Sequence, residues 1–107
     1  MIEKLNLTML TDFYEMTMAN GYFCTDMAED IAYFDMFFRK IPDDGGYAVM
    51  AGLEQVIRYL DGLEFTEEDI EYLRSKKIFN EDFLKYLGDF KFTCDVWAVP
   101  EGTPIFP

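Results

Sequence analysis

The stretch from Thr66 to Val99, TEEDIEYLRSKKIFNEDFLKYLGDFKFTCDVWAV, decides the fold class because its hydrophobic period changes along its length. Thr66 to Asp69 has the pattern of a capping box and precedes apolar residues at helical spacing. Asn80 predicts the N-cap of a second helix, which Gly88 ends. From Phe90 to Val99, apolar residues recur at every second position, which indicates a strand. Helices followed by a strand in one short stretch indicate an α+β domain.

The residues before this stretch add further elements of both kinds. Residues 10–23 have helical periodicity, with Thr8 or Thr11 as the expected cap. Residues 31–38 are short and aromatic and predict a strand that is partly covered on both faces. A loop over residues 42–46 precedes a fourth helix, whose apolar stripe runs from Leu53 and ends near Gly62.

The end of the chain predicts a turn over residues 100–102 and the start of a strand that returns along residues 90–99. The complete order predicts helices plus a small, mostly antiparallel sheet. The chain ends at Pro107, before this hairpin is complete, so we expect the domain to be truncated at its C-terminal edge.

Composition excludes several classes of chemistry. The 107 residues include 21 Asp and Glu, 9 Lys and Arg and no histidine, so the net charge is −12. Without histidine, the chain has no Ser-His-Asp or Cys-His nucleophile pair and no histidine-containing zinc site. An excess of acidic residues argues against nucleic acid as a partner, because Lys and Arg supply the affinity for phosphates. The length suits a single domain.

Cysteine usage and hydropathy indicate a cytoplasmic protein. Cys24 and Cys94 form no Cys-x-x-Cys pair, so we expect both to be reduced and buried. The N-terminus, MIEKLNLTML, has no apolar core of a secretory signal. We also expect no membrane partner, because the chain has no apolar run of roughly 20 residues.

Several acidic groups are candidate sites, and each has a structural interpretation that we favour. Asp43 and Asp44 could form a metal or acid/base pair, but acids next to proline and glycine are ordinary turn formers. The run Glu67, Glu68, Asp69 with Glu71 could hold a divalent ion, yet acids favour a helix N-terminus. Gly45 and Gly46 only weakly match a phosphate-cradling loop.

Asp35 lies within the aromatic stretch 31–38, where an unpaired buried carboxylate would be costly. We therefore expect an ion pair with Arg39 or Arg58, a structural role being favoured over catalysis. The many Phe, Tyr and Met side chains could form a ligand cage or a partner groove, but at this spacing they predict a core.

Blocks that cover nearly all the chain resemble nicotinate phosphoribosyltransferases. TDFYEMTMANGY at residues 11–22 resembles the family's opening helix, TD-x-Y-x-x-TMA-x-GY. FFRKIP at residues 37–42, GGYAV at 45–49 and AGL at 51–53 resemble its next stretch. The Phe83-Leu84 helix resembles its F-L-x-x-L segment, and VPEGTP at residues 99–104 resembles its VPEG-x-P turn.

The resemblance implies that residues 1–107 are the α/β-hammerhead-like N-terminal domain of a type II phosphoribosyltransferase, without the C-terminal barrel-like catalytic domain. Members work as homodimers and join nicotinate to phosphoribosyl pyrophosphate, which gives nicotinate mononucleotide and pyrophosphate for NAD biosynthesis. They use Mg²⁺ and couple the reaction to ATP hydrolysis through a histidine that becomes phosphorylated. That histidine and the phosphate-binding residues would lie beyond Pro107.

By the same resemblance, Tyr14 is a substrate-binding residue that stacks on nicotinate in the active site of the neighbouring subunit. A tyrosine ring is a rigid stacking surface for a flat, electron-poor pyridine carboxylate. No catalytic or metal-binding residue of the family falls in this chain, so we expect residues 1–107 alone to be inactive. The alternatives are a nicotinamide-using phosphoribosyltransferase and a free-standing acidic protein-interaction module.

Overall fold

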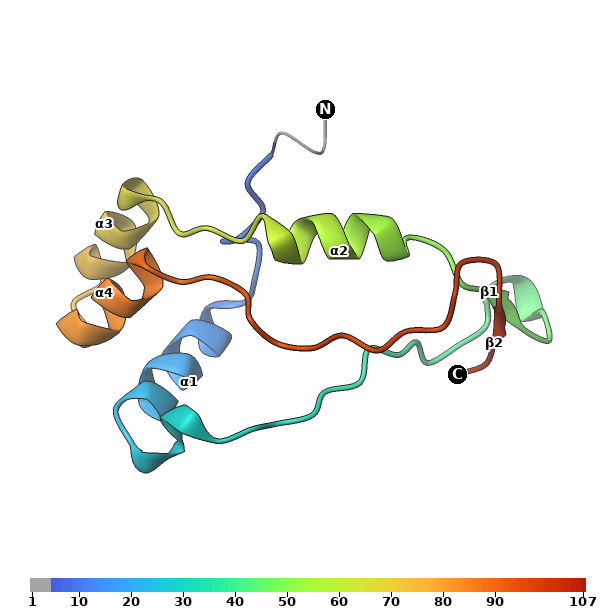
Figure 1. Ribbon diagram of the computed structural model, residues 1–107, viewed down its shortest axis with the longest axis horizontal. Helices are drawn as coiled ribbons and strands as arrows, with labels where there is room; N and C mark the ends of the chain where they lie inside the picture. The colour runs from blue at the N-terminus through green and yellow to red at the C-terminus, as the bar shows by residue number, and fades with distance from the viewer. Residues whose placement is uncertain (1–4) are drawn as a thin grey trace.

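A group of helices at one end of the molecule, a small sheet at the other and helix α2 (Leu53–Asp61) between them confirm the predicted α+β class (Figure 1). The structure is a computed structural model that describes residues 5–107; the first four residues of the N-terminal segment quoted above lie outside it. The described part contains four α-helices, two 3-10 turns and two strands. In chain order they are α1 (Phe13–Phe23), η2 (Asp26–Glu29), η3 (Pro42–Asp44), β1 (Ala48–Val49), α2 (Leu53–Asp61), α3 (Glu67–Ser75), α4 (Glu81–Gly88) and β2 (Pro104–Ile105).

Two of the predicted helix caps are confirmed, and a third is wrong. Thr66 and Asp69 form the capping box of α3, and the Asn80 side chain accepts the N–H groups of Asp82 and Phe83 at the start of α4. Helix α1 instead begins after Asp12, which provides no side-chain cap. Thr8 is buried, and its hydroxyl accepts the N–H of Glu64. The hydroxyl of Thr11 donates to the Glu15 carboxylate. Both threonines therefore have other partners.

The core lies where α1 packs against the antiparallel pair α3 and α4. Its most buried side chains are Leu73, Phe83 and Leu84, and Met16, Ile70 and Leu87 complete it. The Phe83 ring lies 5.7 Å from the ring of Phe23 and 6.1 Å from that of Phe79. Aromatic rings at these distances favour tilted or offset packing, so one ring of α4 joins α1 to the α3–α4 connection.

The small sheet pairs β1 with β2, which the sequence did not predict. Ala48 lies opposite Ile105 and Val49 opposite Pro104, in antiparallel register. Met50 extends this pairing, since its N–H donates to the Thr103 carbonyl at 2.9 Å and its carbonyl accepts the N–H of Gly102 at 2.8 Å. The predicted hairpin between residues 90–99 and 103–107 is therefore wrong. The turn at residues 100–102 directs the chain to Met50 instead.

The strands predicted at residues 31–38 and 90–99 are also not formed. Both segments run as long extended traces between the helical end and the sheet (Figure 1). Within residues 5–107, no backbone hydrogen bond joins residues 31–40 or 91–99 to another part of the chain. Alternation sets which face of a strand is apolar, but a strand forms only where a neighbouring strand accepts its hydrogen bonds.

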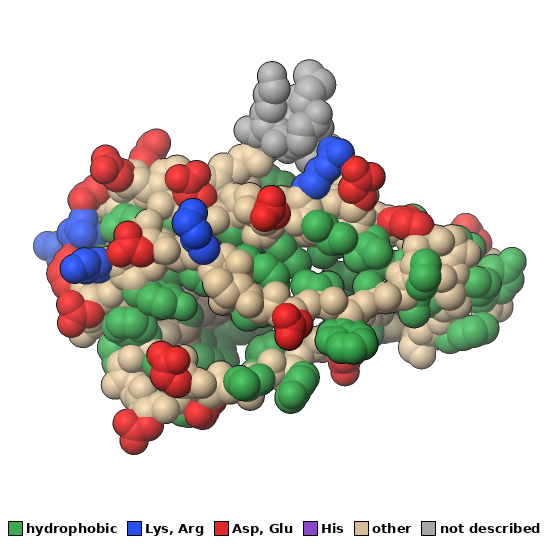
Figure 2. Space-filling view, viewed as in Figure 1, with side chains coloured by type: hydrophobic (Ala, Val, Ile, Leu, Met, Phe, Trp, Pro, Cys, Tyr) green, Lys and Arg blue, Asp and Glu red, His purple; other side chains and the backbone are tan. Residues whose placement is uncertain are grey.

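The shape is open for a chain of this size. The radius of gyration is 16.8 Å, whereas a compact domain of this length has about 13 Å. The accessible surface is 9246 Å², compared with about 6,200 Å² for a compact protein of this mass. Hydrophobic side chains therefore remain on the surface, many of them between the helical end and the sheet (Figure 2).

Truncating the core should destabilise the chain strongly. Leu73 is 1% exposed, so Leu73→Ala is expected to lower the free energy of unfolding by about 2–5 kcal/mol, through lost burial and the cavity left behind. Urea denaturation followed by circular dichroism measures this change. Leu10 is 75% exposed, so Leu10→Ala is the matched control and should have little effect. Equal effects of the two substitutions would contradict this core.

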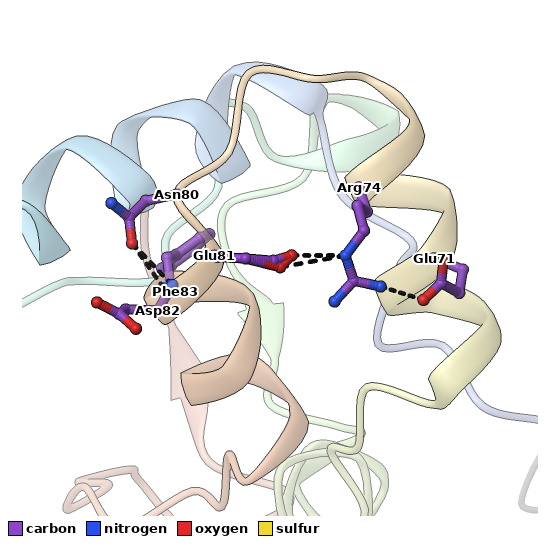
Figure 3. Close-up of polar contacts among 6 residues, drawn as sticks. All are labelled: Glu71, Arg74, Asn80, Glu81, Asp82 and Phe83. Atoms are coloured by element: carbon purple, nitrogen blue, oxygen red, sulfur yellow. Dashed lines mark hydrogen bonds and ion pairs between the residues drawn. The ribbon is translucent and has the colours of Figure 1, made fainter.

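Arg74 joins the two core helices through their outer surfaces (Figure 3). Its Nε lies 2.5 Å from the Glu81 carboxylate, and it also contacts Glu71 one turn earlier in α3. The hydrogen bond to Arg74 holds the pKa of Glu81 below its ordinary value of 4.5, with desolvation opposing it. The same contact with Glu81 raises the pKa of Arg74. All three groups are exposed, so the ion pairs add little stability and are screened by salt.

Glu81→Gln is expected to lower the melting temperature at neutral pH by much less than Leu73→Ala does. A carboxylate with a lowered folded-state pKa stabilises the protein above its unfolded pKa, and this contribution is lost as the pH falls through the folded-state pKa. The difference between wild type and variant should therefore shrink below about pH 4.5. Melting curves between pH 3 and 7 test this, with Asp95→Asn as the charge-matched control. A difference that grows on acidification would contradict the assigned pair.

Candidate functional site

Helix α1 carries apolar side chains on two opposite faces. Met16, Ala19 and Phe23 face the core. On the other side, Tyr14, Met18 and Tyr22 follow one another at four-residue steps, and all three are exposed. We call these three residues the outer stripe. Apolar side chains on two faces of one helix are typical of a helix covered on both sides, so the outer stripe is a candidate contact surface.

Two contacts fix α1 against the rest of the helical end. The ring of Phe13 meets that of Phe79 edge to face, with centroids 5.8 Å apart. The side-chain oxygen of Asn20 accepts the N–H of Asn80 at 3.0 Å, and Asn80 is itself the cap of α4. One contact lies at each end of the helix, so the direction of the outer stripe is set by the core.

Tyr14 lies at the first end of the outer stripe and is 60% exposed. The backbone carbonyl of Tyr14 accepts a hydrogen bond from the Thr17 hydroxyl at 2.9 Å. This contact lies within α1 and does not involve the Tyr14 ring. No hydrogen bond of its phenol to any of residues 5–107 is found. The side chain therefore offers a ring face and a hydroxyl to a molecule outside its own chain.

A hollow of about 700 Å³ lies between α1, η2, the end of α2 and α4, and Tyr22 at the end of the outer stripe is part of its walls. Its walls are largely aromatic and aliphatic, with Glu29 as their charged residue. They comprise Thr8, Thr11, Met16, Ala19, Tyr22, Phe23, Ala28, Glu29, Tyr59, Leu63, Phe65, Phe83, Tyr86, Leu87 and Phe90. These walls include no Lys or Arg, so they offer no charged partner to a carboxylate or a phosphate. Tyr14 is not part of them.

The acidic candidates occupy the structural positions that we favoured. Asp43 and Asp44 are exposed in η3 and adopt left-handed backbone angles, with φ of 57° and 53°. Asp tolerates this conformation because its short side chain bonds locally. The acids from Glu67 to Asp69 form the first turn of α3. Gly45 and Gly46 do not begin a helix, since α2 starts at Leu53. Within the described range, no group of three or more metal-ligating side chains is found.

Two predictions about buried groups are wrong. Asp35 is exposed and forms no ion pair within residues 5–107; Arg58 pairs with Glu54 at 2.7 Å, and Arg39 lies 5.1 Å from the ring centre of Phe37. Both cysteines are free and exposed rather than buried. Asp35 and Cys94 lie on extended segments that the other described residues leave exposed, so their side chains meet water. A solvated carboxylate needs no partner.

The cap of α2 is a contact that the sequence did not predict. Gly52 occupies the N-cap position with φ of 99°, which glycine adopts readily, and it has no side chain to cap the helix. The Glu101 carboxylate accepts the N–H of Leu53 at 2.5 Å instead. Ser, Thr, Asp or Asn usually provides the side chain that caps a helix at this position. The glycine in its place was therefore the sign in the sequence that another segment caps α2. This contact joins residues 45–53 to residues 99–104, two of the blocks that resemble the family.

The longest α-helix of the described chain, α1, has 11 residues, and no helix in that part could cross a bilayer.

The sequence of this chain matches one family of known proteins. A model of the nicotinate phosphoribosyltransferase (NAPRTase) N-terminal domain matches residues 9–107. Nicotinate phosphoribosyltransferase pncB2 of Mycobacterium tuberculosis (strain H37Rv) is 46% identical over 99 residues, which are 92% of this chain and 21% of that protein. Nicotinate phosphoribosyltransferase of Bacillus subtilis is 40% identical over 101 residues, which are 94% of this chain and 21% of the relative.

The similarity extends to animals. Nicotinate phosphoribosyltransferase of Bos taurus is 36% identical over 102 residues, which are 92% of this chain and 19% of that protein. The chain thus spans about a fifth of the length of the curated relatives that it matches. Because the family model covers nearly all of it, the chain belongs to the nicotinate phosphoribosyltransferase family and corresponds to the N-terminal domain.

Proposed function

We propose that this chain is the N-terminal part of an enzyme that joins nicotinate to phosphoribosyl pyrophosphate, giving nicotinate mononucleotide and pyrophosphate for NAD salvage. The family match over residues 9–107 and the names of the relatives support this reaction. The relatives reported above are named for nicotinate, so we propose nicotinate rather than nicotinamide as the substrate. The reaction would be coupled to ATP hydrolysis in a homodimer, with a C-terminal barrel-like catalytic domain following residue 107.

The chemistry is a displacement at the anomeric carbon of the ribose. The bond between this carbon and the pyrophosphate oxygen breaks, and the nicotinate nitrogen forms the new bond. This step needs an aligned nucleophile and a stabilised leaving group more than a proton transfer. The chain contains no histidine, and the walls of its hollow include no cation. We therefore assign it a positioning role and place the phosphate-binding and catalytic groups in the remainder of the enzyme.

Mg²⁺ is the metal that the family resemblance implies. The part of the chain that the structure describes brings together no set of three carboxylates or other ligating groups. These residues do not fit a magnesium site by themselves, so we assign no step of this chain to the metal.

The exposure of Tyr14 is the observation that carries the proposed role of this chain. The ring projects from a helix whose opposite face packs on the core. The Tyr14 side chain is not part of that core, and it is exposed to solvent. Such a ring can enter the active site of a neighbouring subunit without rearrangement of its own fold. It would stack on the pyridine ring of nicotinate and hold the attacking nitrogen in line, with no transfer of a proton.

Tyr14→Ala in the full-length enzyme is expected to raise the KM for nicotinate about fivefold, because an aromatic pair contributes about 1 kcal/mol beyond its buried area. The fall in kcat should be no larger than this rise. Tyr14→Phe retains the ring and should behave nearly as wild type. Tyr72→Ala, at an exposed tyrosine of α3, is the matched control. Steady-state kinetics with varied nicotinate measure these effects, and unchanged kinetics in an intact Tyr14→Ala dimer would remove Tyr14 from the site.

Mixed dimers test whether Tyr14 acts in the neighbouring subunit. Tyr14→Ala subunits are combined with subunits that have an intact Tyr14 and an inactivated catalytic domain. If Tyr14 acts across the dimer, each hybrid contains one complete site, and the low KM for nicotinate returns. If Tyr14 serves its own subunit, no hybrid contains a complete site, and the KM stays high.

A further inference from the structure

The two extended segments, residues 31–38 and 92–98, are largely exposed, and no other described residue pairs with their backbones. Their side chains include the most exposed aromatic groups of the described residues: Tyr33 and Trp97 are each 94% exposed, and Phe34 is 91% exposed. Their backbones make no hydrogen bonds to other described residues. Large rings and an unpaired extended backbone together are the properties of an uncovered strand.

The sequence of each segment indicates a strand that is covered when the protein is complete. Residues 31–38 carry apolar side chains on both faces, which is typical of a strand inside a sheet with a layer on either side. Residues 92–98 alternate, with Phe92, Cys94, Val96 and Ala98 on one face. A surface strand of a monomer would instead carry Lys, Glu or Pro at such positions. Residues 31–38 have one charged side chain, Asp35.

We propose that both extended segments pair through their backbones with strands of the same polypeptide that lie C-terminal to residue 107. This inference rests on the proposed function, since it requires the remainder of the enzyme. The family model describes an N-terminal domain, and the relatives are about five times as long as this chain, so their remaining sequence follows the matched region. The chain exposes about 3,000 Å² more than a compact protein of its mass does. If a partner of equal area covered this excess, about 6,000 Å² would be buried on the two sides together, which is at the upper end of what obligate interfaces bury.

The charge of the chain argues against a second copy as the partner of these segments. Each copy carries a net charge of −12, so two copies paired edge to edge would repel one another. The partner within the same polypeptide is also tethered to the chain, which raises its effective concentration.

The test uses the full-length protein with a specific protease site inserted directly after Pro107. After cleavage, the two pieces should remain together in size-exclusion chromatography with mass determination. Phe34→Glu and Trp97→Glu should release them, because each places a charge where we expect buried sheet. Both side chains are almost fully exposed within residues 5–107, so neither substitution should disturb the core of this chain. Tyr72→Glu, on the exposed side of α3, is the matched control and should leave the pieces together.

Hydrogen exchange of the uncut wild-type protein provides a second measurement that needs no variant. The amides of residues 32–38 and 92–98 should exchange roughly 100-fold or more slowly than unstructured peptide, because hydrogen-bonded strands open rarely. Random-coil exchange rates there would overturn the proposal. Separation of the wild-type pieces after cleavage would also overturn it, whether residues 1–107 then elute as a monomer or as a dimer of two copies. Pieces that stay together in all variants would also overturn it. Neither measurement uses nicotinate or activity, so failure here is distinct from failure of the proposed reaction.

Discussion

The ring of Phe83 is the contact on which the packed part of this structure depends. It is 2% exposed and meets Phe23 of α1 and Phe79 of the α3–α4 connection. Through these two contacts one residue of α4 fixes the helix that carries Tyr14. Asn20 and Asn80 add a hydrogen bond of defined geometry between the same helices. Apolar burial supplies the attraction, and the amide contact sets the register.

The opposite end of the molecule depends on polar contacts instead. Met50 exchanges two backbone hydrogen bonds with the turn that contains Gly102, and Glu101 caps α2 at Leu53. Residues 45–53 and 99–104 are far apart in the sequence but form one small unit. Both blocks also carry the resemblance to the family. Two of their glycines have a structural purpose, since Gly52 and Gly102 adopt positive φ angles that other residues rarely adopt.

Between the two ends lie the extended segments, whose backbones pair with no other part of residues 5–107. An enzyme whose site is completed by two subunits needs rigid groups that project from their own fold. Tyr14 meets that requirement because α1 is held on the face opposite to its outer stripe. The extended segments are a different kind of surface, since they lack hydrogen bonds as well as cover. In our proposals, the first surface contacts a ligand through a side chain, and the second adds its backbone to a sheet.

The sequence by itself determined what depends on neighbours along the chain. The capping box at Thr66, the Asn80 cap, the helices α2 to α4 and the turn at Asp43 follow from contacts within a few residues. It also predicted the family, because the blocks occur in the family's order. Only the tertiary structure decided that Thr103–Pro107 returns to Ala48 rather than to residues 90–99, and that Glu101 caps α2. It likewise decided that Asp35 and both cysteines are exposed. Pairing and burial depend on which distant segments meet, and an alternating pattern specifies the face of a strand but not its neighbour.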